Sequence, residues 1–176
     1  MNDLLKALLS VVTGGIGAYI ALLAKDFVDR GTNARAADIE EYKKIRIILT
    51  DALVATLESA DFLSGMVRAR FTDRLNDLRH AYEGGRSLIF HNPRLNVQFV
   101  ALLKNAEDFQ MQVANLTIPE GDPPKVTTRP RADRVYPSDE TRKQSGDEAK
   151  ILDGLAKRLA AACKAFIDDG KRQLRT

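Results

Sequence analysis

The chain has 176 residues, of which 44% are hydrophobic and 29% are charged, as is ordinary for one folded domain with an appendage. Its 27 basic and 24 acidic residues are mixed along the sequence and leave a net charge of +3, which argues against a nucleic-acid partner. One cysteine and two histidines exclude an internal disulfide and do not supply a zinc ligand set. Few aromatic residues and many Ala and Leu favour an all-α fold.

The first predicted element is the uncharged stretch ALLSVVTGGIGAYIALLA, residues 7–24, which lies between Lys6 and Lys25. Eighteen helical residues rise about 27 Å, close to the thickness of the hydrocarbon core of a bilayer. The apolar segment extends to residues 4–24 because Lys6 can direct its ammonium group toward the lipid head groups. The pattern predicts a single transmembrane helix within an anchor of residues 1–30.

Two alternatives to an anchor are open for this stretch. A cleaved signal peptide is disfavoured because Asp3 lies in the amino-terminal region and Leu22 would occupy a position that requires a small residue. The second alternative is a soluble protein in which residues 4–28 form a buried core helix.

Small residues line one face of the predicted transmembrane helix at alternating spacings of three and four. They are Ala7, Ser10, Gly14, Gly17, Ala21 and Ala24. Small faces let helix backbones approach closely in lipid, where no hydrophobic force drives association. The pattern predicts a transmembrane contact, either in a homo-oligomer or with another helical protein.

Basic residues that follow the anchor set its expected orientation. Lys25, Arg30, Arg35, Lys43 and Lys44 outnumber the cations on the short amino-terminal side. The positive-inside rule then places the bulk of the chain in the cytoplasm, as a single-pass protein of the cell inner membrane. A lone cysteine suits that reducing compartment.

Residues 31–116 are predicted to form an antiparallel helical bundle. Apolar residues recur every three or four positions across 34–63 and 66–83, with Ser64–Gly65 as the only weak point, where one helix bends or two helices meet. Gly84 and Gly85 end this pattern. Asn92 and Pro93 then provide a cap and a first residue for a helix over 93–116.

Residues 117–146 contain five of the six prolines and few apolar side chains, so they are predicted to be a Pro-rich flexible connector, a disordered linker. An amphipathic helix is predicted within residues 147–176, with Gly170 as its stop and Cys163 as a packing residue. Its regular apolar stripe indicates that it docks on the earlier helices or on another protein.

No residue pattern in the chain matches a catalytic, cofactor-binding or metal-binding motif. We therefore expect a non-enzymatic, membrane-anchored interaction or scaffold protein without a cofactor or a small-molecule substrate. Two other functions are open. One is a membrane-perturbing effector that oligomerises in the bilayer, and the other is a soluble helical binding module.

Overall fold

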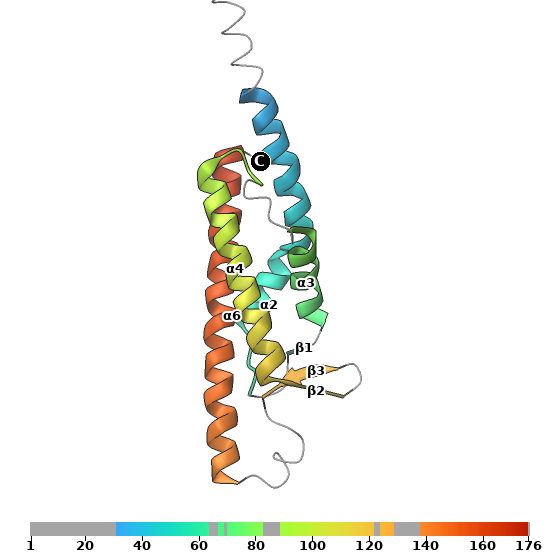
Figure 1. Cartoon of the computed structure of the whole chain (residues 1–176), viewed down its shortest axis with the longest axis vertical. Helices are drawn as coiled ribbons and strands as arrows, with labels where there is room; N and C mark the ends of the chain where they lie inside the picture. The colour runs from blue at the N-terminus through green and yellow to red at the C-terminus, as the bar shows by residue number, and fades with distance from the viewer. Residues whose placement is uncertain are drawn as a thin grey trace, which may run out of the picture.

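The computed structural model describes residues 31–63, 67–68, 70–82, 89–121, 124–128 and 138–175. These ranges are mostly helical: residues 31–48, α2 (Asp51–Glu58), α3 (Arg70–Tyr82), α4 (Pro93–Leu116) and α6 (Asp139–Leu174). α4 and α6 pack side by side in opposite directions, and α2 and α3 pack against this pair (Figure 1). The all-α expectation holds for most of the described chain, to which a small sheet is added.

α4 matches its predicted boundaries, because its start and its end are encoded locally. The side chain of Asn92 accepts hydrogen bonds from the backbone N–H groups of Arg94 and Leu95, at 3.1 and 3.2 Å. Pro93 occupies the first turn, where its missing N–H leaves no partner unsatisfied. The buried residues of the helix recur every three or four positions along one face, and they are Leu95, Phe99, Leu102, Ala106, Phe109, Gln110 and Val113.

α6 begins eight residues earlier than predicted and continues beyond the predicted stop. The hydroxyl of Ser138 accepts from the Thr141 N–H at 3.2 Å and caps the helix, so residues 139–146 are helical rather than part of a disordered linker. Gly170 lies inside the helix and is buried. Gly170 therefore lets the Tyr42 ring pack closely against α6 and does not end the helix. The predicted docking of this helix on the earlier helices is confirmed.

The predicted helix over 34–63 is wrong at two places. Helix 31–48 ends before Leu49, and a new helix, α2, starts after Thr50. α2 then ends at Glu58, and residues 59–63 are not helical. Ser64 and Gly65, where the break was expected, lie outside the described residues.

Three short strands form an antiparallel sheet in the order β1 (Val67–Arg68), β3 (Lys125–Thr127), β2 (Ile118–Glu120). β2 and β3 lie in the segment predicted to be a disordered linker, and that prediction is wrong for them. Thr128, after β3, donates its backbone N–H to the Phe62 carbonyl at 3.3 Å and its hydroxyl to the Ser145 carbonyl at 3.0 Å. These bonds attach the sheet to the segment after α2 and to α6, while Val126 adds a buried side chain to the core.

Aromatic rings fill the centre of the bundle. The largest fully buried side chains include Phe62, Phe90, Phe99, Phe109 and Phe166. The centroid of the Phe99 ring lies 5.3 Å from that of Phe166 and 5.6 Å from that of Phe90. These separations fall in the range that aromatic pairs prefer, so rings from three segments of the chain hold the helices together.

No helix in the described ranges combines the length and the apolar composition that crossing a bilayer requires. The predicted anchor, residues 1–30, lies outside the described residues.

Candidate functional site

The six small residues predicted to form a transmembrane contact lie outside the described residues. The structure therefore brings none of Ala7, Ser10, Gly14, Gly17, Ala21 and Ala24 to a described surface. Polar contacts between described elements occur at the break between helix 31–48 and α2.

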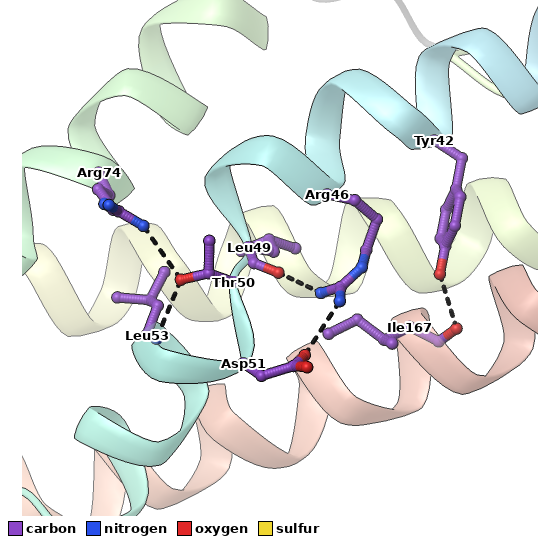
Figure 2. Close-up of polar contacts among 8 residues, drawn as sticks. All are labelled: Tyr42, Arg46, Leu49, Thr50, Asp51, Leu53, Arg74 and Ile167. Atoms are coloured by element: carbon purple, nitrogen blue, oxygen red, sulfur yellow. Dashed lines mark hydrogen bonds and ion pairs between the residues drawn. The ribbon is translucent and has the colours of Figure 1, made fainter.

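Thr50 occupies this break and links two helices through one hydroxyl. Its Oγ1 accepts from the Leu53 N–H at 3.2 Å, as the N-cap of α2, and from Nη1 of Arg74 on α3 at 3.0 Å (Figure 2). The first bond caps the start of α2, and the second connects that start to α3. This threonine is a structural joint.

Arg46 spans the same break from the other side. Its Nη1 donates to the Leu49 carbonyl at the end of helix 31–48, and its Nη2 donates to Asp51 Oδ1 at 3.0 Å (Figure 2). A cation at a helix carboxyl end and an anion at a helix amino end are both favoured by the helix dipoles. The Arg46 guanidinium thus links the end of helix 31–48 to the start of α2.

Tyr42 lies one turn before Arg46 and binds α6. Its hydroxyl donates to the Ile167 carbonyl at 2.9 Å (Figure 2). Burial raises the pKa of this phenol, the Arg46 charge lowers it, and the Asp168 and Asp51 charges raise it. The phenol is protonated at neutral pH even at its ordinary pKa of 10, and the net rise in pKa makes it a still weaker acid, so it serves as a donor across the helix interface.

A groove of about 580 Å³ adjoins the break, beside α2 and β1. It receives the cations Arg68 and Arg74 and the anion Asp61. Its hydroxyls at Thr56 and Ser59 donate to carbonyls of their own helix, at 2.8 Å each. Among the described residues that line it there is no His or Cys, so the groove offers polar contacts without an evident nucleophile–base pair.

Cys163 is buried in the core, as the sequence predicts for a packing residue. Burial raises the pKa of its thiol to about 12. Such a thiol is almost entirely protonated at neutral pH and is a poor nucleophile. In the part of the chain that the structure describes, no cluster of three or more His, Cys, Asp or Glu residues could hold a metal ion.

Exposed charged side chains gather where the start of helix 31–48, the start of α4 and the end of α6 meet. The buried carboxylate of Asp38 accepts from the His91 N–H at 2.7 Å and from the Asn92 N–H at 2.9 Å, which joins helix 31–48 to the start of α4. Arg35 donates from Nη2 to the Leu174 carbonyl at 3.0 Å, which joins the same helix to the end of α6.

We call this part of the bundle the basic end, because its exposed charged side chains are Arg35, Arg94, Lys171, Arg172 and Arg175. The five cations come from three segments that are far apart in the sequence. No sequence motif groups them, since the only shared signal is the absence of acids from each segment.

Comparison with known proteins finds no matching family model, no matching curated protein and no matching solved structure. The functional argument therefore depends on the geometry of this chain.

Proposed function

We propose that the chain is a non-enzymatic interaction or scaffold protein tethered to the cell inner membrane. In this proposal residues 4–28 form the single-pass anchor, and the described bundle is the cytoplasmic head. The uncharged stretch between Lys6 and Lys25 supports the anchor, and the cations after it support the orientation.

The observation that carries the proposal is the way the chain enters the bundle. Helix 31–48 extends past the end of the α4–α6 pair, and none of residues 31–37 is buried (Figure 1). Burial begins at Asp38. The chain therefore reaches the core from one end, which is the geometry that a tethered head requires.

Self-association through the anchor is part of the same proposal. Ala7, Ser10, Gly14, Gly17, Ala21 and Ala24 would form the contact with a second copy or with another helical protein. Replacing both Gly14 and Gly17 with Leu should abolish self-association of residues 1–30 in a membrane reporter assay, because the added side chains separate the backbones. Unchanged association would refute this contact.

Fractionation of cells that express the full chain tests the tether. We expect the protein to remain in the membrane pellet after carbonate and high-salt washes and to dissolve in detergent. External protease added to spheroplasts should leave the bundle intact. Extraction without detergent would favour a soluble binding module, and leakage of a potassium-sensitive dye on induction would favour a membrane-perturbing effector.

A further inference from the structure

The basic end differs in charge from the rest of the molecule. Segments 31–37, 91–97 and 170–175 together contain five Lys and Arg residues and no Asp or Glu. All five cations are exposed. Across the whole chain, by contrast, 27 basic residues are nearly balanced by 24 acidic ones. These three segments therefore carry charge of a single sign, which the overall composition does not predict.

The nearest carboxylates only partly offset this charge. Asp38 and Asp169 are buried; Asp38 binds backbone N–H groups, and Asp169 binds Gln98 and Arg172. Glu40, further along helix 31–48, is paired with Lys43 at 2.9 Å. Among the described residues, Arg35, Arg94 and Arg175 form no ion pair. Arg172 pairs with Asp169, and Lys171 lines a groove that also receives the carboxylates of Asp51, Glu58 and Asp168. A positive field therefore faces outward mainly at Arg35, Arg94 and Arg175.

Helix stability does not account for all of these cations. Lys171, Arg172 and Arg175 lie at the carboxyl end of α6, where the helix dipole favours positive charge. Arg94 lies in the first turn of α4, where the dipole opposes it. Arg94 is therefore placed against the local electrostatic preference, as expected for a side chain that meets a negatively charged partner.

We propose that the basic end docks on anionic phospholipid head groups. This inference rests on the proposed function, because residue 31 lies at this end and residues 1–30 lead from it. A tether that starts there would bring the five cations to the membrane surface. Each basic side chain close to an anionic bilayer strengthens the association about fivefold.

The test uses the full chain with phosphatidylcholine vesicles and with vesicles that also contain phosphatidylserine. A fluorophore is attached at Val97→Cys, which replaces an exposed residue near the basic end, and in a second protein at Ile118→Cys on β2. Buried Cys163 does not compete for the label. Flotation measures association, and quenching by head-group spin-labelled lipid measures how close each probe lies to the surface.

We expect flotation with both vesicle types, and strong quenching at Val97→Cys only with phosphatidylserine. The probe at Ile118→Cys should be quenched weakly in both. Salt at about 0.5 M should release the quenching, since it shortens the screening length to about 4 Å. The variant Arg94→Gln, Lys171→Gln, Arg175→Gln should lower the docked-to-undocked ratio about a hundredfold.

The matched control is Lys104→Gln, Lys125→Gln, Lys143→Gln, which removes the same charge from exposed positions away from the basic end. It should leave the quenching unchanged, and circular dichroism should show that both triple variants fold. Flotation with both vesicle types but equal quenching overturns the docking alone. Flotation only with anionic vesicles, reversed by salt, overturns the tether alone. Flotation with neither overturns both.

Discussion

At Gly170 the side chain of Tyr42 occupies the space where a Cβ would stand. An added Cβ would lie 2.0 Å from Tyr42 Cε2 and 2.6 Å from Cζ. The ring is held by its hydrogen bond to the Ile167 carbonyl and by its contact with Phe166, so it has little freedom to move. Glycine is thus the residue that lets helix 31–48 approach α6.

Gly170→Ala should therefore lower the free energy of unfolding by roughly 1–3 kcal/mol, although alanine is the better helix former. Gly154→Ala is the matched control, because it lies in the same helix with nothing within 4 Å of its added Cβ. That variant should gain about 0.5–1 kcal/mol. Urea denaturation followed by circular dichroism measures both, and equal gains would contradict the packing at Tyr42.

The reactivity of the Cys163 thiol provides a second prediction. Its thiol, with a pKa raised by burial to about 12, should not react with a thiol reagent at pH 7–8 while the protein is folded. The same thiol should react promptly in denaturant. The exposed thiol of Val97→Cys should react at once in the folded protein, and rapid loss of both thiols under native conditions would show that Cys163 is accessible.

Asp153 predicts a dependence on pH. Burial raises the pKa of this carboxyl, the hydrogen bond from the Phe62 N–H lowers it, Asp61 raises it and Lys157 lowers it, with a net rise. The folded state therefore binds this proton more tightly than the unfolded state. The contribution of Asp153 to stability is greatest at acidic pH and falls as the pH rises through the raised pKa.

Asp153→Asn keeps an oxygen acceptor for the Phe62 N–H but removes the partly buried charge. We expect it to be at least as stable as the unsubstituted protein at pH 7. This advantage should shrink below about pH 4, where the aspartate is protonated in both states. Thermal unfolding at several pH values measures the difference, and a constant offset at every pH would be inconsistent with this linkage.

The break between helix 31–48 and α2 depends on Thr50. Thr50→Ala removes both the cap of α2 and the acceptor for Arg74, and should cost about 1–2 kcal/mol of unfolding free energy. Thr50→Ser, which keeps the hydroxyl, should retain most of the unfolding free energy that Thr50→Ala loses. Thr56→Ala is the control, since its hydroxyl binds only the Ala52 carbonyl one turn earlier. Equal effects at the two positions in chemical denaturation would contradict the capping role.

Local signals explain which elements could be predicted. α4 was predictable because Asn92, Pro93 and an apolar stripe are contiguous in the sequence. The break at Thr50 was missed because Ile45, Leu49, Leu53 and Leu57 keep one unbroken helical phase across it, and all four are buried. The stripe shows which side is buried, but it does not show where the chain changes direction.

The sheet and the early start of α6 had weaker signals. Val67 pairs with Val126, and no periodicity within strands of two or three residues reveals a partner so distant in the sequence. Ser138 caps a stretch of mostly exposed polar residues, which resembles a linker until the helix is seen to continue into the core. The basic end was also missed, because its cations are far apart in the sequence and only the fold brings Arg35 and Arg94 near Lys171.

The set of residues that forms the core provides a test of the tether. The described core side chains run from Tyr42 to Leu174 and form one cluster. A chain without residues 1–30 should therefore stay helical and unfold cooperatively on heating, with a midpoint close to that of the full chain in detergent. Loss of cooperativity, or binding of a dye that reports exposed apolar surface, would show that residues 4–28 belong to the core.

The length of α6 has a practical consequence. Its 36 residues span about 54 Å, and Figure 1 shows its last turn at the basic end and its first turn beyond the sheet. A reporter fused after Thr176 would be crowded against whatever the basic end touches. One inserted at Gly121, in the turn after β2, would stand on the far side of the molecule. With the basic end docked on a bilayer as proposed, the helix would act as a spacer and would hold cargo recruited near the sheet several nanometres from the lipid.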